Sequence, residues 1–246
     1  MFTIEERDRV RESLLAMARA DNRVVAGAEV GASAQGGGDR WSDLDLAFGL
    51  GDGARAVDVF SDWTADLGER YGAVQLFDLP FASSLYRVFL FPGCLQVDLS
   101  LTPGATFGAL GPKFKLLFGS SMEGQTPTPS TAGHLFGLAA HHAVRARISI
   151  ERGRVWQAEY WISGLRDQAL SLACRLRGLP AEGRGFDDLP PELLGRFHPA
   201  IVRSLDRNEL LRALEAAVHQ LLEVAGDDDP RAAAIAAQLR VMATDE

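Results

Sequence analysis

The sequence of 246 residues contains little cysteine, little lysine and no long apolar run. Its two cysteines, Cys94 and Cys174, are too few and too far apart for a disulfide framework or a zinc motif, so we expect two reduced core thiols in a cytoplasmic protein. No apolar run approaches the roughly 18–20 residues that span a bilayer, which argues against a membrane protein. The charged N-terminal segment also lacks the apolar stretch of a signal peptide.

Positive charge is scarce relative to negative charge. The chain has 25 basic and 33 acidic residues, and its net charge of −8 argues against a nucleic-acid partner. Apolar residues make up 47% of the chain, enough to form the core of one large domain or two small ones. Only two basic residues are lysines, Lys113 and Lys115. A coding bias toward arginine explains why lysine is rare, but it does not explain why the two lysines are neighbours.

The first half of the chain has the pattern of an α/β unit with short strands. Apolar spacing predicts helices at 3–20 and 54–70. Valine-rich or alternating stretches predict strands at 23–30, 44–48, 73–77, 84–91 and 94–101. We expect the two lysines in a loop after the last of these strands.

The second half of the chain has helical patterns and no strand signal. The helices are predicted at 132–151, 155–177, 207–225 and 230–242. We therefore expect an α+β protein, with a short-stranded mixed sheet flanked by helices in residues 1–125 and an all-helical bundle in residues 126–246.

The segment Val30–Leu46, VGASAQGGGDRWSDLDL, combines a strand end, a glycine-rich turn and two aspartates at the start of another strand. Because side chains alternate along a strand, Asp43 and Asp45 project to the same side. Two such carboxylates repel each other unless a cation or a proton lies between them, and hard oxygen ligands suit Mg²⁺. The glycine-rich turn can bring backbone N–H groups close to a phosphate.

A third acid, Asp98, lies within the apolar strand CLQVDLSL, where an unpaired charge would be costly. A metal ion at the strand would explain an acid at this position. Three carboxylates can hold two metal ions about 3.5–4 Å apart, which activate an attacking hydroxyl and stabilise a leaving phosphate. The pattern therefore predicts phosphoryl or nucleotidyl transfer.

Three short motifs follow one another in this half: Gly31-Ala32-Ser33, Asp43-Leu44-Asp45 and Val97-Asp98-Leu99. Over residues 23–118 they resemble the nucleotidyltransferase superfamily that includes DNA polymerase beta. The size and the helical second half are similar to the antibiotic nucleotidyltransferases that act on aminoglycosides and lincosamides. The resemblance implies that the Mg²⁺ ligands are Asp43, Asp45 and Asp98. It implies that the triphosphate, with ATP as the expected nucleotide, is bound by Gly31, Ala32 and Ser33.

The chain departs from the family pattern at two positions of the turn. The family has a serine directly after the glycine and often a basic residue soon after it, whereas this chain has Ala32 and Gln35. This departure bears on binding of the triphosphate and not on the three aspartates expected to bind the metal. It leaves open a second hypothesis, in which the chain is a catalytically weakened or inactive nucleotide-binding or regulatory module.

In the helical half, the helix predicted at 155–177 places five polar or aromatic residues along one broad face: Trp156, Glu159, Tyr160, Ser163 and Asp167. Enzymes of the family place a carboxylate of the helical domain as general base for the acceptor hydroxyl. We take Glu159 as the first candidate and Asp167 as the second; the alternative is a glutamate paired with an arginine on a solvated face. Residues 145–177 also carry seven arginines against three acids, and these arginines are either triphosphate ligands or ordinary surface residues.

The leading hypothesis is an enzyme that transfers a nucleoside monophosphate, with Mg²⁺, from a nucleoside triphosphate to a hydroxyl of a small molecule such as an aminoglycoside or lincosamide antibiotic. A third hypothesis, a ribonuclease-like helical half, rests only on Arg212 and His219, seven residues apart on one helical face. The sequence predicts no oligomeric state.

Overall fold

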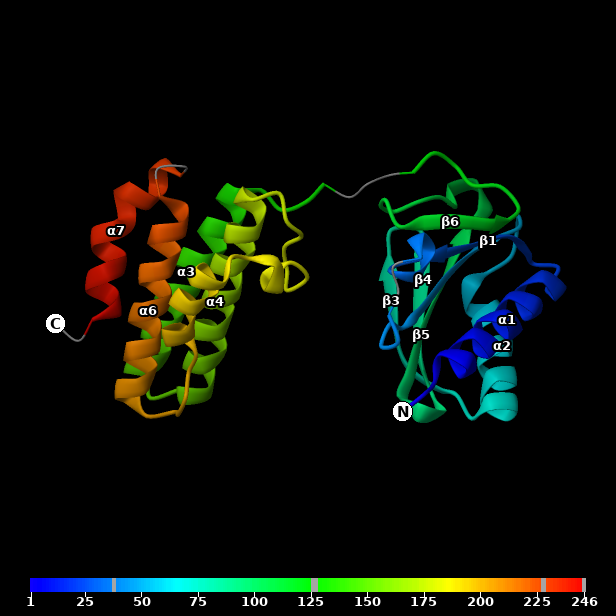
Figure 1. Ribbon diagram of the computed structural model, residues 1–246, viewed down its shortest axis with the longest axis horizontal. Helices are drawn as coiled ribbons and strands as arrows, with labels where there is room; N and C mark the ends of the chain where they lie inside the picture. The colour runs from blue at the N-terminus through cyan, green and yellow to red at the C-terminus, as the bar shows by residue number, and fades with distance from the viewer. Residues whose placement is uncertain (37–38, 125–127, 227–228, 245–246) are drawn as a thin grey trace. The chain divides into compact units, whose positions relative to one another are not determined.

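A computed structural model confirms the predicted α+β class. It describes the whole chain except residues 37–38, 125–127, 227–228 and 245–246. The chain divides into two units, Met1–Thr128 with a mixed sheet flanked by helices and Pro129–Glu246 with helices (Figure 1). The domain boundary predicted between residues 125 and 126 lies outside the described residues.

The first unit is built on a six-stranded sheet in the order β3-β4-β5-β2-β1-β6. Among the described strands only β2 and β5 pair in parallel, and the other neighbours pair antiparallel. The strands are β1 Val24–Val30, β2 Leu44–Leu50, β3 Val74–Phe81, β4 Ser84–Phe91, β5 Leu95–Pro103 and β6 Phe114–Phe118. The parallel pair lies in the middle of the sheet, so the two strands that carry the candidate metal ligands are direct neighbours.

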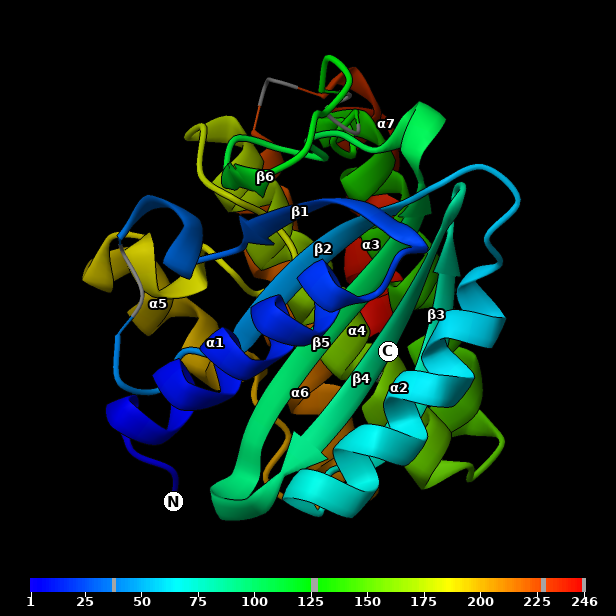
Figure 2. The same cartoon turned by 90° about the vertical axis from the view of Figure 1, so that its right-hand side faces the viewer.

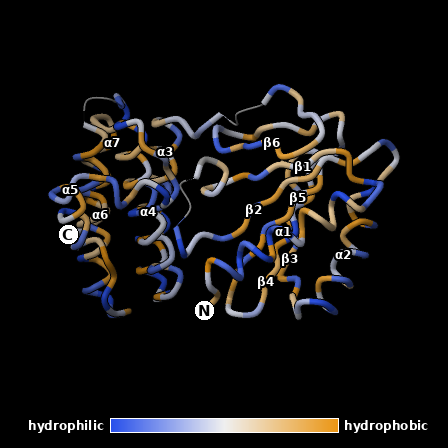
Figure 3. The backbone as a smooth tube through the Cα atoms, turned by 45° about the vertical axis from the view of Figure 1, so that its right-hand side comes forward, coloured by the Kyte–Doolittle hydropathy of each residue, from blue (hydrophilic) through white to orange (hydrophobic). Residues whose placement is uncertain are grey.

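Two helices, α1 (Ile4–Ala20) and α2 (Ala56–Tyr71), cover one face of this sheet (Figure 2). The side chain of Thr3 and the side chain of Glu6 cap the start of α1 reciprocally. The core between helices and sheet includes the following buried side chains: Leu14, Leu44, Leu46, Phe48, Val59, Phe60, Trp63, Leu67, Phe89, Val97, Leu99 and Leu101. In Figure 3 much of β2 and β5 has the hydrophobic colour, in agreement with this core.

Polar contacts fix the middle of α1 to β1 and the end of α1 to α2. The Arg11 guanidinium donates two hydrogen bonds, of 2.8 and 3.0 Å, to the buried carboxylate of Glu29 in β1. At the end of α1, the Asp21 carboxylate accepts from Arg23 at 2.8 and 2.9 Å and from the indole N–H of Trp63 in α2 at 3.0 Å. Chiefly because Arg23 donates these bonds, the pKa of Asp21 falls from 3.8 to about 2.

The second unit is a helical bundle. Its α-helices are α3 Ala132–Glu151, α4 Val155–Leu176, α5 Pro191–Phe197, α6 Arg207–Ala225 and α7 Pro230–Ala243. A short turn at Gly153 joins α3 to α4, and small side chains such as Ala139, Ala143 and Ala158 are fully buried in the core. The described residues of this unit contain no strand, as the sequence predicted. None of the described helices of the chain combines the length and the apolar character needed to cross a membrane.

Three local predictions are wrong. The segment of Lys113 and Lys115 is not simply a loop, because Lys115 lies within β6, which pairs with β1. No helix is predicted between residues 177 and 207, but α5 lies there and begins at Pro191, since proline fits the first turn of a helix. Cys94 is exposed in the turn between β4 and β5 with φ of +62°, so only Cys174 is a core thiol.

We expect Asp21→Asn to lower the free energy of unfolding of the first unit by about 1–2 kcal/mol at pH about 7, because the amide replaces an ion-paired carboxylate. The pKa of Asp21 is lower in the folded state, about 2, than its ordinary value of 3.8. Its contribution is therefore complete above pH about 4 and is lost as the pH falls toward about 2. Urea unfolding at several pH values, followed by tryptophan fluorescence, measures the difference.

Asp62→Asn is the matched control. Asp62 also accepts a 2.7 Å hydrogen bond from Arg23, but its side chain is 66% exposed. An exposed pair of this kind contributes less than about 1 kcal/mol. Equal losses in the two variants would contradict the structural role assigned to Asp21.

Candidate metal centre

Three aspartates converge on the paired strands β2 and β5. In the parallel register Asp45 lies directly opposite Asp98, and Asp43 lies two residues before Asp45. Each offers one carboxylate oxygen, and these oxygens lie within 4.8 Å of one another. All three residues are half-buried. The structure thus brings together the acids that the sequence singled out, in an arrangement that could hold a divalent cation.

The electrostatics of this acidic cluster disfavour three bare carboxylates. Burial raises the pKa of Asp98 and the negative charge of Asp43 raises it further, while a 3.0 Å hydrogen bond from the Gln96 side chain to Oδ1 opposes the shift. Burial, with a smaller effect of Asp45, also raises the pKa of Tyr86 on the neighbouring strand β4. A cation bound between the carboxylates would remove this repulsion.

The acidic cluster lies on the sheet face away from α1 and α2. Leu44, Leu46 and Leu99, the strand neighbours of the acids, belong to the core under the helices. Because successive side chains point to opposite faces, Asp45 and Asp98 point to the other side. That face therefore presents the carboxylates, while the apolar side chains of the same strands hold the sheet in place.

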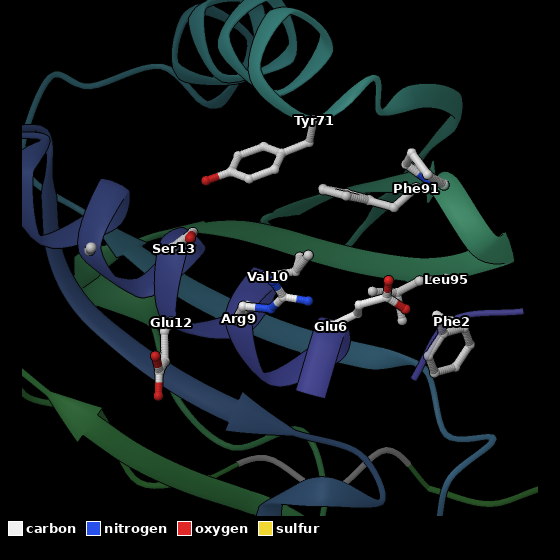
Figure 4. A pocket seen from close by; sticks show the side chains of 11 residues that line it. Phe2, Glu6, Arg9, Val10, Glu12, Ser13, Tyr71, Phe91 and Leu95 are labelled. Atoms are coloured by element: carbon white, nitrogen blue, oxygen red, sulfur yellow. The ribbon is translucent and has the colours of Figure 1, made fainter. Parts of the chain in front are cut away.

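A cavity of about 550 Å³ lies on the helix-covered face instead. Figure 4 shows its wall of α1 side chains, among them Glu6, Arg9 and Val10, opposite Tyr71 of α2 and Phe91 of β4. Since the sheet separates this cavity from the acidic cluster, its volume is no part of the candidate metal centre.

The glycine-rich turn packs directly against the acidic cluster. Gly31 has φ of +71°, and a Cβ atom placed on it would lie 2.1 Å from Oδ2 of Asp45. Ala32 precedes the short 3₁₀ helix η1 (Ser33–Gln35), and both Ala32 and Ser33 are half-buried. Glycine is therefore required at position 31 by its backbone conformation and by the adjacent carboxylate. The turn predicted to bind phosphate therefore lies directly against Asp45, one of the predicted metal ligands.

Arg7 is a supporting residue that sequence reasoning missed. Its guanidinium donates to the carbonyl oxygens of Asp39 at 2.7 Å and Ser42 at 3.2 Å, on the segment that leads into Asp43. Within that segment the Asp39 carboxylate accepts from the Trp41 N–H at 2.8 Å and from the Ser42 hydroxyl at 3.0 Å. Arg7 lies on α1, and the residues that it contacts come 32 or more positions later in the sequence. No local sequence pattern therefore indicates the contact.

The candidate bases belong to the second unit and have partners there. The Glu159 carboxylate on α4 accepts a 2.7 Å hydrogen bond from the Ser163 hydroxyl, not a bond from an arginine. The Asp167 carboxylate accepts from Arg166 at 2.9 Å. Of the two carboxylates, that of Asp167 is paired with an arginine and that of Glu159 is bonded by a hydroxyl. The role of Glu159 as a base stays a prediction.

Other residues of the second unit differ from their expected settings. Trp156 and Tyr160, on the face shared with Glu159, are 75% and 65% exposed and do not belong to the core of the bundle. Arg212 donates to Glu209 and to the carbonyl oxygens of Pro199 and Ile201, so it fixes the turn before α6. This structural role explains Arg212 without a ribonuclease site.

Comparisons with known proteins show a distant likeness to solved structures. No family model matches the sequence, and no curated protein matches it. Among solved structures, an aminoglycoside 6-adenyltransferase from Bacillus subtilis is similar, with 13% identity and a TM-score of 0.39 over 98% of this chain and 99% of that chain. Values this low establish no shared activity, so the function proposed below rests on the acidic cluster and its turn.

We expect Gly31→Ala to weaken Mn²⁺ or Mg²⁺ binding at the acidic cluster at least about tenfold, because the new methyl group displaces the Asp45 carboxylate. Titration calorimetry measures the affinity. Gly36→Ala is the matched control, since Gly36 has φ of +72° and nothing within 4 Å of its added Cβ. It introduces the same backbone strain without the clash. Equal loss in both variants would assign the effect to strain and not to Asp45.

Proposed function

We propose that this chain is a Mg²⁺-dependent nucleotidyltransferase that moves a nucleoside monophosphate from a nucleoside triphosphate to a hydroxyl of a small molecule. The observation that carries the proposal is the register of β2 and β5, which sets Asp45 opposite Asp98 beside Asp43 and against the Gly31 turn. When bound, Mg²⁺ would neutralise charge on the phosphates and lower the pKa of the attacking hydroxyl.

The residues of the chain have separate tasks in this reaction. Asp43, Asp45 and Asp98 would hold the metal, and the backbone N–H groups after Gly31 would receive phosphate oxygens. The acceptor oxygen forms a bond to the α-phosphorus, and the bond from that phosphorus to the bridging oxygen of pyrophosphate breaks. The proton of the hydroxyl passes to a base, and pyrophosphate leaves. Positioning and charge neutralisation account for most of the catalysis.

The acceptor class that we propose is an aminoglycoside or lincosamide antibiotic, because the sequence motifs resemble the small antibiotic nucleotidyltransferases. The net charge of −8 suits a cationic acceptor. ATP is the first nucleotide to test, followed by GTP and CTP.

We expect Asp45→Asn to lower turnover at least about a thousandfold, because the amide cannot replace an anionic metal ligand. Pyrophosphate release with ATP and Mg²⁺ across an acceptor panel measures turnover. Asp52→Asn removes the same charge from an exposed residue just after the opposite end of β2, and it should keep wild-type turnover. Equal turnover of wild type and Asp45→Asn would exclude the metal assignment.

For the proposed base, we expect Glu159→Gln to lower kcat about 10²–10⁴-fold. Ser163→Ala removes the hydroxyl that donates to Glu159 and keeps the carboxylate, so its effect should be much smaller. If kcat stays unchanged in Glu159→Gln, the base is another group.

A second candidate function is a nucleotide-binding or regulatory module without turnover. Ala32 favours it, because this residue offers the phosphate a backbone N–H but no hydroxyl. Calorimetry with ATP, GTP and CTP in the presence of Mg²⁺ distinguishes the two candidates when combined with the turnover assay. Binding of a nucleotide without turnover on any acceptor would favour the module.

A further inference from the structure

The acidic cluster belongs to a row of residues that crosses the sheet from β2 to the edge strand β3. Asp45 of β2 lies opposite Asp98 of β5. Asp98 in turn lies opposite Val88 of β4, and Val88 lies opposite Phe77 of β3. Directly opposed side chains project to the same face of a sheet, so Phe77 lies on the face of the aspartates. Since neighbouring strands are about 4.8 Å apart, Phe77 lies about 10 Å from Asp98.

Contacts with α2 show independently which face this is. The Arg87 guanidinium donates to the carbonyl oxygen of Phe60 in α2 at 3.0 Å and to the Asp78 carboxylate of β3 at 2.7 Å. Arg87 and Asp78 therefore point to the helix-covered face. Because side chains alternate along a strand, their neighbours Val88 and Phe77 point away from the helices.

The β3 end of this face carries exposed apolar side chains. Phe77, Leu79 and Phe81, which we call the β3 patch, are alternate residues of one strand and are 53%, 53% and 47% exposed. The residues opposite them in β4 are uncharged: Val88, Tyr86 and Ser84. Burial and the charge of Asp45 raise the pKa of Tyr86, so the β3 patch adjoins the surroundings of the acidic cluster. An exposed apolar patch beside a candidate site indicates a binding surface.

The edge of β3 is poorly suited to pairing with a further strand. Its pairing with β4 shifts in register between Gln75 and Phe77, and Pro80 has no N–H group to donate. Bulges and prolines are the features by which natural sheets prevent edge-to-edge pairing. A ligand of the β3 patch must therefore meet its face, which is also the face of the acidic cluster.

We propose that the β3 patch binds an apolar part of the acceptor, and that the acceptor is an amphipathic hydroxyl compound of the lincosamide kind and not an aminoglycoside. This inference rests on the proposed function. With the acceptor hydroxyl at the acidic cluster, an apolar group about 10 Å away would lie over Phe77. Lincosamides combine hydroxyl groups with an alkyl chain, whereas aminoglycosides carry hydroxyl and ammonium groups throughout.

The charge of β3 supports this choice of acceptor. Several ammonium groups would need carboxylates near the β3 patch, but the one acid of the strand, Asp78, points to the other face and is paired with Arg87. An apolar group needs no such partner and gains from leaving water. The three side chains of the β3 patch thus determine specificity without contacting the reacting atoms.

The test is steady-state pyrophosphate release by the full chain with ATP and Mg²⁺, using lincomycin and kanamycin as acceptors. We expect the wild type to have the higher kcat/KM with lincomycin. Phe77→Ser and Leu79→Ser should each raise the KM for lincomycin at least about tenfold and leave kcat within about threefold, because they remove binding and not chemistry. Phe77→Leu, which keeps an apolar side chain, should retain most of the affinity.

Leu116→Ser is the matched control. Leu116 is 39% exposed on β6, the opposite edge strand of the same sheet, and it lies opposite Ala28 of β1. The variant exchanges the same residue types as Leu79→Ser, and its KM for lincomycin should stay within about twofold of the wild type. An equal rise in Leu79→Ser and Leu116→Ser would overturn the assignment to the β3 patch.

The other outcomes separate this inference from the proposed function. If the wild type releases pyrophosphate with no acceptor, both are overturned. If it prefers kanamycin, or if the variants of the β3 patch leave the KM for lincomycin unchanged, the inference alone is overturned. A raised KM for ATP alone would assign the patch to the nucleobase. A wild-type dimer that dissociates in Phe77→Ser, measured by size-exclusion chromatography, would assign it to an interface between copies. Either assignment overturns the role in acceptor binding.

Discussion

The parallel register of β2 and β5 is the constraint on which the candidate site depends. It sets Asp45 opposite Asp98, while the alternation of side chains sends their neighbours Leu46 and Leu99 into the core under the helices. The same strands thus stabilise the unit on one face and concentrate negative charge on the other. A shift by one residue would bury the acids and expose the leucines, so the core enforces the geometry of the site.

The elements around this parallel pair supply what two strands cannot. Gly31 leaves β1 with a left-handed conformation and lies against Asp45, which joins the turn to the acids. Arg7 fixes the segment before Asp43 from α1, and the Arg11–Glu29 pair fixes α1 to β1. The acidic cluster is consequently supported by contacts between segments distant in sequence, which allows like charges to stay close together.

Strong periodic patterns made most elements predictable, and weak or ambiguous patterns explain the errors. The strand β6 has five residues, too few for a clear pattern, and it forms because β1 offers a free edge. Pro191 breaks a helix in most settings but begins α5. The exposure of Trp156 and Tyr160 could not be predicted, because spacing on a helix defines a face and not what covers that face.

By itself, the sequence determined the α+β class, the order of most elements and the identity of the three acids, because these follow from local periodicity and from charges placed within apolar strands. Only the tertiary structure decided that Asp98 lies opposite Asp45, that Arg7 supports the loop before Asp43 and that β6 pairs with β1. Those relations depend on strand order and register, which are fixed by packing between distant segments and leave no trace in neighbouring residues.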